Sequence, residues 1–445
     1  MMIRKYFYPF LLTAFAALVT LILVFGKKDR VPPLKPREVA ITPASEWLNT
    51  RAAIEGLRDK LRKNSGDQKA ALQLALAYIQ EGRVTGNHAY YDPAALQLLN
   101  QVLKKEPDHF DALCGKATVY LSGHHFAEAI PIAQRAVQLN PYSAFAYGLL
   151  VDGYVEMGNY PKAVEMAEKM IAARPDIRSY ARISYLREIH GDYPGAIEAM
   201  DMAVKAGQPG LEQTAWTRVH LGQLYEETGK LPEAEHQYRK TLAERPHYAY
   251  ALAGLGRMEK LKKNYKEAVA YLQKAARSVP DPAFTEQLVE VYKLSGQPEK
   301  AAKVNRTLIA QLTGDGHAGK DDPENEIGHY ADLELAYAYL KTNQPALALR
   351  HAEAEYERRP QNIDVNEALA WVQYKRGAYA EAGKHIALAL RTGSQKPALL
   401  YRAGLIHMKN GQPETGRELL DKSLSINPFL RLQSVWEAPA YLAGN

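Results

Sequence analysis

Proline recurs along this chain at an interval of 34 residues. The interval holds within three series, in the last of which a serine takes the middle place: Pro107, Pro141 and Pro175; Pro246 and Pro280; Pro360, Ser394 and Pro428. Because proline does not continue a helix, each of these positions is expected to follow a helix end. A fixed period of this length predicts a repeated pair of helices, which stacks on its neighbours because one pair cannot bury its apolar face alone.

Other residue types keep the same register. Alanine recurs at one position of the predicted second helix: Ala129, Ala163, Ala196, Ala234, Ala268, Ala301, Ala348 and Ala382. Small or apolar residues stand twelve positions before four of these alanines: Ala117, Val151, Gly222 and Gly256. Glycine recurs where the two helices would turn: Gly158, Gly191, Gly229, Gly296, Gly377 and Gly411. The small residues would let the two helices approach closely, and the glycines would tolerate a left-handed backbone at the turn.

Aromatic rings recur on the first helices and at the start of the second helices: Tyr120, Tyr154, Tyr225, Tyr292 and Tyr339; Phe126, Tyr160, Tyr193, Tyr265 and Tyr379. This pattern of small residue, aromatic ring, alanine and proline resembles the tetratricopeptide repeat family. The resemblance covers about residues 67–428 and implies an all-α fold, a right-handed α-solenoid of about ten helix-turn-helix units. The expected segments are a capping helix at 44–66, units 1–4 at 67–206, units 5–7 at 207–312, a polar loop at 313–326, units 8–10 at 327–428 and a C-terminal cap at 429–445.

The N-terminus reads as a membrane-targeting segment. A short basic tail at 1–8 precedes a transmembrane or signal-anchor helix at 9–26, and a proline-rich spacer follows at 27–43. The uncharged run is about 20 residues, near the length that spans a bilayer. We therefore expect a single-pass membrane protein, and we favour an extracytoplasmic position for the large domain. The alternative is a cleaved signal peptide and an exported, secreted protein.

The charge distribution and the absence of catalytic motifs exclude several classes of function. The formal charge is +6, and the first 38 residues hold seven basic and two acidic side chains, so the rest of the chain is nearly neutral. This argues against a nucleic-acid partner. The single cysteine, Cys114, excludes an intrachain disulfide and a multi-cysteine metal site. No phosphate-binding loop, nucleophile elbow or paired zinc motif occurs, and the repeats leave no segment for a catalytic domain. We expect no enzyme activity, no catalytic residues and no cofactor.

Two clusters contain residue types that can bind metals, but we expect neither cluster to bind one. His124 and His125 are adjacent in a predicted turn, and adjacent residues do not share a helix face, so we expect solvated loop side chains. The acidic loop from Asp315 to Glu326 lacks the alternating oxygen ligands of a calcium loop and reads as a polar linker.

The resemblance also implies a binding surface. In that family the first helix of each unit lines a concave groove that holds an extended peptide or a partner helix. Carried onto this chain, that face predicts these partner-binding residues: Phe145, Arg178, Arg182, Tyr185, Trp216, His220, Tyr250, Arg257, Tyr330, Tyr337, Trp371, Tyr374, Tyr401 and Arg402. Aromatic rings and arginine are the side chains most enriched at interface hot spots.

The expected function is therefore a membrane-tethered scaffold for protein–protein interaction. Its partner would be a protein or an extended peptide held in the groove, and the N-terminal helix would hold it at the membrane. The alternative is a non-catalytic regulatory or assembly subunit of a membrane or envelope enzyme complex. The sequence leaves open whether the chain also self-associates.

Overall fold

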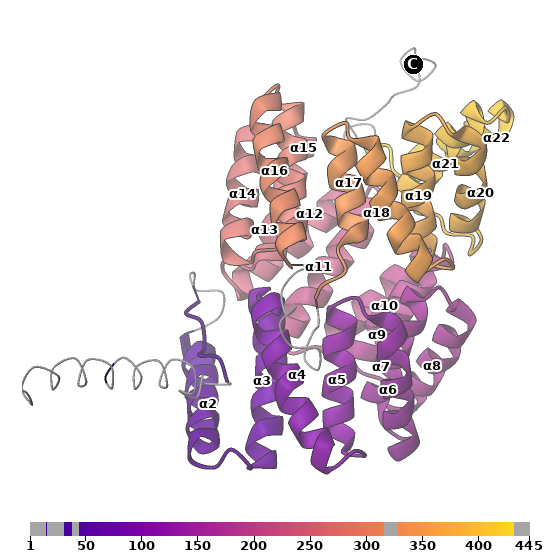
Figure 1. Ribbon diagram of the computed structural model, residues 1–445. Helices are drawn as coiled ribbons and strands as arrows, with labels where there is room; N and C mark the ends of the chain where they lie inside the picture. Colours follow the sequence, from indigo (N-terminus) through magenta and orange to yellow (C-terminus); the bar gives the residue numbers. More distant parts are fainter. Residues whose placement is uncertain (1–14, 16–30, 38–43, 316–327, 431–445) are drawn as a thin grey trace, which may run out of the picture. The chain divides into compact units, whose positions relative to one another are not determined.

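The computed structural model describes Phe15 and residues 31–37, 44–315 and 328–430 (Figure 1). The chain divides into two compact units, Met1–Lys35 and Pro36–Asn445, and the helices described below belong to the second. Among the described residues, no helix combines the length and the apolar character needed to cross a bilayer. Apart from Phe15, the predicted span at 9–26 lies outside the described residues, as do 38–43, most of the predicted polar loop and most of the predicted C-terminal cap.

The described part of the second unit is helical throughout, without a strand. Its helices are α2 Ala44–Lys63, α3 Gln68–Thr85, α4 His88–Lys105, α5 Phe110–Ser122, α6 Phe126–Leu139, α7 Ala144–Glu156, α8 Tyr160–Ala173, α9 Ile177–Ile189, α10 Tyr193–Ala206, α11 Glu212–Glu227, α12 Leu231–Glu244, α13 Ala249–Leu261, α14 Tyr265–Ser278, α15 Pro282–Leu294, α16 Pro298–Asp315, α17 Asp332–Lys341, α18 Pro345–Arg358, α19 Ile363–Lys375, α20 Tyr379–Ala389, α21 Pro397–Lys409 and α22 Pro413–Ile426. From α3 onward they pack as consecutive pairs, α3 with α4 through α21 with α22, and α2 packs on α3 (Figure 1). The predicted all-α repeat fold is confirmed.

Local chemistry sets the helix ends. Asp67 and Ser143 accept hydrogen bonds from the backbone N–H groups three residues later, which satisfies a free donor at the start of α3 and α7. All six glycines predicted at the turns within pairs have a positive φ of 71–80°. At the equivalent turns without glycine, His124, Lys263 and Asn343 take the same left-handed conformation, with φ of 55–64°.

Small residues make close contacts between neighbouring helices, both within a pair and from one pair to the next. Tyr238 is fully buried between Gly222 and Gly254, and a Cβ atom at either glycine would lie within 2.7 Å of its ring. The recurring alanines of the second helices are all buried. The period in the sequence is therefore a packing period, because each repeated small residue marks a place where two helices come too close for a larger side chain.

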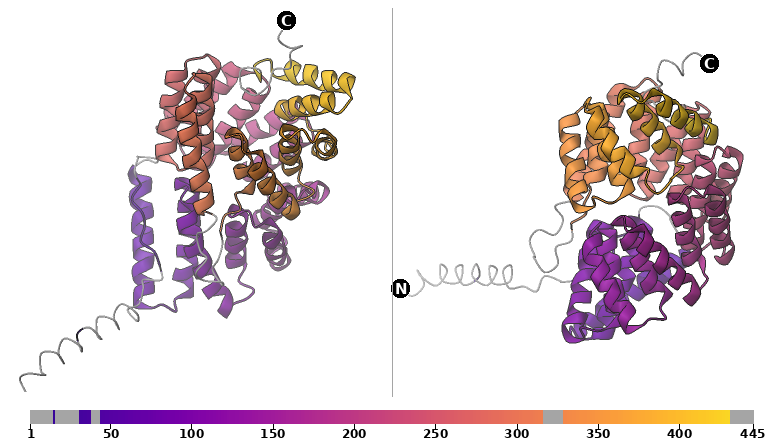
Figure 2. Two further views of the ribbon diagram at one scale, coloured as in Figure 1. Left: turned by 45° about the horizontal axis from the view of Figure 1, so that its top comes forward. Right: turned by 90° about the vertical axis from the view of Figure 1, so that its right-hand side faces the viewer.

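Repeats far apart in the sequence also touch, at a separation close to six periods. His125 Nε2 lies 2.7 Å from Gly328 O, Asn362 Nδ2 donates to Glu156 O (2.9 Å), and Asn427 Nδ2 donates to Glu226 O (3.2 Å); these pairs are 203, 206 and 201 residues apart. In each, the turn within an early pair meets a segment that leads into or ends a later pair. The later helices, orange and yellow in Figure 2, thus lie against the purple and magenta ones. These contacts lock successive turns of the solenoid together.

Candidate functional site

A cavity of about 1140 Å³ opens along the first helices of the early pairs. Its lining comes from α3, α5, α7, α9, α11 and α13, with one residue each from α4 and α10. First helices of consecutive pairs lie side by side on one surface of the stack, so each contributes the side chains that its neighbours and its own second helix leave uncovered. This is the surface on which the sequence places the binding residues.

Eight of the fourteen predicted residues line this cavity: Phe145, Arg178, Arg182, Tyr185, Trp216, His220, Tyr250 and Arg257. Three of the rings are among the more exposed large apolar side chains of the described residues, with Phe145 and Tyr185 at 39% and Trp216 at 36%. Trp216 lies against the His220 ring, with centroids 3.9 Å apart. Burial and the nearby charge of Arg257 lower the pKa of His220 to about 4, so this imidazole is neutral at physiological pH.

Two of the predicted arginines already have anionic partners in the cavity wall. Arg182 donates to both carboxylate oxygens of Asp152, at 2.8 and 2.5 Å. Arg257 donates to both oxygens of Glu226 at 3.0 Å and to the Tyr238 hydroxyl at 3.1 Å. These charge-assisted hydrogen bonds hold neighbouring first helices together. A role for either arginine in binding a partner stays a prediction.

Arg178 is in a different situation. Its guanidinium lies over the Phe145 ring, 5.5 Å from the centroid, and no carboxylate of the described residues lies within ion-pair distance of it. Burial lowers the pKa of Arg178, and the positive charges of Arg182, Arg83 and Arg174 act in the same direction against the influence of Asp176. An acidic group placed here would relieve this repulsion.

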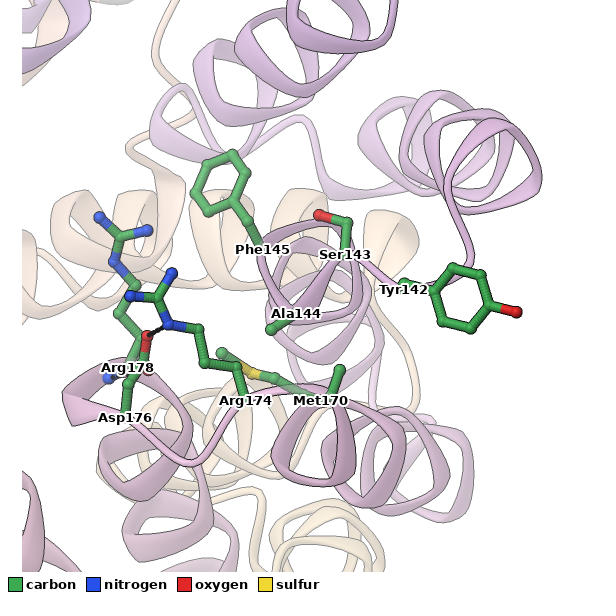
Figure 3. Close-up of a pocket in the computed structure, with 9 residues that line it drawn as sticks. Tyr142, Ser143, Ala144, Phe145, Met170, Arg174, Asp176 and Arg178 are labelled. Carbon is green, nitrogen blue, oxygen red and sulfur yellow. Dashed lines mark hydrogen bonds and ion pairs between the residues drawn. The ribbon is translucent and has the colours of Figure 1, made fainter.

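A smaller pocket of about 220 Å³ adjoins the cavity at Arg178 and Phe145 (Figure 3). Arg174 and Asp176 form an ion pair at 3.3 Å on one side of it, and the Tyr142 ring points away from them. Sequence reasoning missed this pocket. It lies where the chain enters α7 and α9, and its local signals are the two helix caps, Ser143 of α7 and Asp176 of α9.

A pair of carboxyl groups at another part of the lining was also missed. Burial, with repulsion from Glu227, raises the pKa of Glu188 to about 8, and burial raises that of Glu227. The Tyr193 hydroxyl donates to Glu227 at 2.8 Å. Lys396, from the segment before α21, faces both carboxyls, and Asp364 raises its pKa. This cluster combines groups brought together by the turns of the solenoid, so the repeat register gives no sign of it.

The other six predicted residues lie outside the cavity: Tyr330, Tyr337, Trp371, Tyr374, Tyr401 and Arg402. Trp371 is 7% exposed and stacks on Tyr374, with centroids 5.0 Å apart and an interplanar angle of 8°. Arg402 lies over the Trp371 ring and donates to Glu367 at 2.6 Å. These side chains are largely occupied by one another, and a binding role for them stays a prediction.

The expectation for His124 and His125 needs correction, because neither side chain is solvated. The side chain of His125 is 11% exposed, and its ring lies 4.2 Å from that of Tyr330. His124 Nδ1 is 2.9 Å from Tyr330 O, and burial lowers the pKa of His124 to about 3. A turn that looks exposed from its own repeat is covered by another repeat about 200 residues later.

Family comparisons match most of the solenoid. A tetratricopeptide repeat model matches residues 93–144, 149–210, 220–282 and 333–397, and a second one matches 397–429, together more than half of the chain. A stretch of 227 residues is 23% identical to the protein CTR9 homolog of Arabidopsis thaliana, and covers 48% of this chain and 21% of that protein. The chain thus matches only about a fifth of that relative's length.

Solved structures with similar folds include a thermophilic tetratricopeptide repeat protein from Thermus thermophilus. It is 22% identical, with a TM-score of 0.37, and the match covers 42% of this chain and 98% of that one. The human IFIT1 dimer with PPP-AAAA is 12% identical, with a TM-score of 0.46, over 87% of this chain and 88% of that one.

Proposed function

The chain belongs to the tetratricopeptide repeat family, and we propose that its repeats bind an extended segment of a partner protein in the cavity along α3 to α13. The observation that carries the proposal is the set of exposed rings, Phe145, Tyr185 and Trp216, within one concave surface. Exposed apolar rings gathered in a cavity are costly in water and become favourable when a partner covers them.

The lining points to the chemistry of the segment. The rings would take apolar side chains, and Arg178 would take an acidic side chain, since it lacks a carboxylate partner among the described residues. Four arginines and six carboxyl groups line the cavity. Two of these carboxyl groups, Glu188 and Glu227, have raised pKa values, so the lining carries charges of both signs and no strongly basic surface. Nucleic-acid binding depends on neutralising phosphates and favours a basic surface. A polypeptide with mixed charge fits this surface better.

We also propose that the N-terminal segment tethers this binding unit to a membrane. The support is the uncharged run at 9–26 between basic flanks, followed by the proline-rich segment at 27–43, which would serve as a spacer. The extracytoplasmic side is our preferred orientation, and a cleaved signal remains the alternative. A solenoid without catalytic motifs could act as a free scaffold or as a non-catalytic subunit of a membrane enzyme complex, and the two differ in whether a catalytic subunit copurifies.

The test compares two double variants of the full-length protein. Partners are captured by crosslinking in intact cells, purified from solubilised membranes and identified by mass spectrometry. Arg178→Ala with Trp216→Ala removes one cation and one ring from the cavity. Arg306→Ala with Leu347→Ala removes an exposed arginine and an exposed apolar side chain outside it.

We expect a specific protein to be recovered with the wild type and the outside variant, and its recovery to fall at least about tenfold with the cavity variant. Equal recovery with both variants would contradict the proposal and place binding on another surface. Recovery of only further copies of this chain would indicate self-assembly instead. Protease treatment of intact cells or spheroplasts gives the membrane orientation, and full protection of the repeats would contradict the extracytoplasmic position.

A further inference from the structure

Three metal-ligand side chains from distant parts of the chain meet outside the cavity. His124 lies in the turn between α5 and α6, His329 lies just before α17, and Glu334 lies in the first turn of α17. One nitrogen of each histidine and one carboxylate oxygen of Glu334 lie within 4.8 Å of one another, and all three side chains are half-buried. The two imidazole rings are 4.1 Å apart. Two imidazoles and a carboxylate so close together are an unusual set for a structural turn.

The hydrogen bonding of His124 favours metal ligation. Its Nδ1 is 2.9 Å from Tyr330 O, and a carbonyl only accepts, so Nδ1 carries the proton and donates. The lone pair is then on Nε2. Metal-binding histidines usually donate their other ring N–H to a backbone carbonyl or carboxylate in this way, which fixes the tautomer.

Glu334 supplies the independent observation. Its Oε2 atom is shielded from solvent and has no hydrogen-bond partner in the described part of the chain. A buried carboxylate oxygen without a donor costs free energy, and native structures normally satisfy such groups with protein, water or an ion. A cation bound by the Glu334 carboxylate beside the two imidazoles would supply the missing partner.

One nearby cation already has anionic partners of its own. Arg359 influences both His124 and Glu334, and it forms ion pairs with Glu355 and Glu156, each at 2.5 Å. Its charge is therefore balanced by two carboxylates outside the cluster. Arg359 therefore does not neutralise the Glu334 carboxylate through an ion pair.

We propose that His124, His329 and Glu334 bind a divalent transition-metal ion of the Zn²⁺ type. Two imidazole nitrogens and one carboxylate oxygen suit Zn²⁺, with a water as the fourth ligand. Bond lengths of about 2.1 Å in tetrahedral geometry place ligand atoms about 3.4 Å apart. The ligand atoms lie within 4.8 Å of one another, so side-chain rotations that shorten each separation by at most about 1.4 Å would give this geometry. The ion would tie the turn after α5 to the start of α17, across successive turns of the solenoid.

The experiment uses the full-length protein in detergent, with any purification tag removed and metal stripped by a chelator. Zn²⁺ is titrated by calorimetry, and Co²⁺ by visible absorption, because tetrahedral Co²⁺ with nitrogen and oxygen ligands has a distinctive spectrum. We expect one ion per chain and a rise in the thermal unfolding temperature with Zn²⁺, because an ion that binds only the folded state stabilises it.

The variants separate this site from adventitious binding by the 13 histidines of the chain. His329→Ala and the isosteric Glu334→Gln should each weaken Zn²⁺ binding at least tenfold and abolish the Co²⁺ spectrum. His236→Ala, which removes an exposed histidine on α12, should change neither. Circular dichroism confirms that each variant is folded. The proposal is wrong if both site variants keep wild-type affinity, or if the wild type takes up less than one ion under saturating Zn²⁺.

Discussion

Trp216 on α11 is 36% exposed in the cavity, whereas Trp371 on α19 is 7% exposed. Both lie on first helices of the same type of repeat, and the sequence analysis assigns both to the same binding face. The difference comes from their neighbours. Trp216 contacts the small ring of His220, while Trp371 is covered by Tyr374 on one side and by Arg402 from the next first helix. The same repeat pattern thus gives a first-helix surface with exposed rings in the early pairs, which we call the early wall, and one with covered rings in the late pairs, which we call the late wall.

Aromatic side chains thus have two roles on this solenoid, one in packing between repeats and one on an exposed surface. In the late stretch, from α17 to α21, rings and arginines fill the space between consecutive first helices and stabilise the stack. In the early stretch, from α3 to α13, the ion pairs of Arg182 and Arg257 hold the first helices together, and some rings are left exposed. Stability measurements can therefore test which side chains are structural before any partner is known.

The largest effect is expected from the two tryptophans themselves. Trp371→Ala should lower the free energy of unfolding by about 3–5 kcal/mol, because it leaves a cavity among buried rings. Trp216→Ala should cost less than about 1 kcal/mol, because water already reaches the side chain. Urea unfolding of both variants, followed by circular dichroism, measures the difference. Equal losses would mean that the early and late walls are packed alike.

Alanine substitutions at two glycines test how tightly successive turns of the solenoid pack. Gly158 and Gly296 occupy equivalent turns with φ of 72° and 71°, so alanine costs each about 1 kcal/mol in backbone strain. A Cβ atom at Gly158 would lie 2.1 Å from Gln361 O, whereas one at Gly296 would meet nothing within 4 Å. Gly158→Ala should therefore cost about 2 kcal/mol more than Gly296→Ala in the same unfolding assay. Similar costs would show that the backbone around Gln361 moves to accept the added methyl group without a loss of stability.

Two arginines, one in each wall, are expected to differ in their contribution to stability. Arg402→Ala, in the late wall, leaves the buried carboxylate of Glu367 without its partner and should cost about 1–3 kcal/mol. Arg178→Ala, in the early wall, breaks no ion pair of the described residues and should change stability by less than about 0.5 kcal/mol. Thermal unfolding of the two variants under identical conditions gives the ranking. A larger loss for Arg178 would assign it a structural role and weaken its assignment to an acidic group of the partner.

The sequence predicts what repeats and little of what lies between the repeats. The helix pairs, the buried alanines and the positive φ of Gly158 and Gly411 all follow from contacts within one unit, which the 34-residue period records directly. Exposure of a ring such as Trp216 depends on the side chains of the next first helix. The burial of His124 depends on a segment more than 200 residues away. The 34-residue period records none of these contacts, because each joins side chains of different repeats.

The smallest effect concerns Glu188, where the early wall faces Lys396 and Asp364 of the late stretch and Glu227 of its own. Its folded pKa of about 8 lies above the ordinary value of 4.5, so the folded state binds the proton more tightly. The stability from this proton is fully present below pH 4.5 and is lost as pH rises to about 8. Glu188→Gln, which mimics the protonated acid, should match the wild type near pH 4 and be more stable than the wild type near pH 9. Unfolding curves across this range test the sign. A variant that is less stable than the wild type at pH 9 would mean that Glu188 is ionised in the fold and paired with Lys396, which would make this contact an attraction between the two stretches.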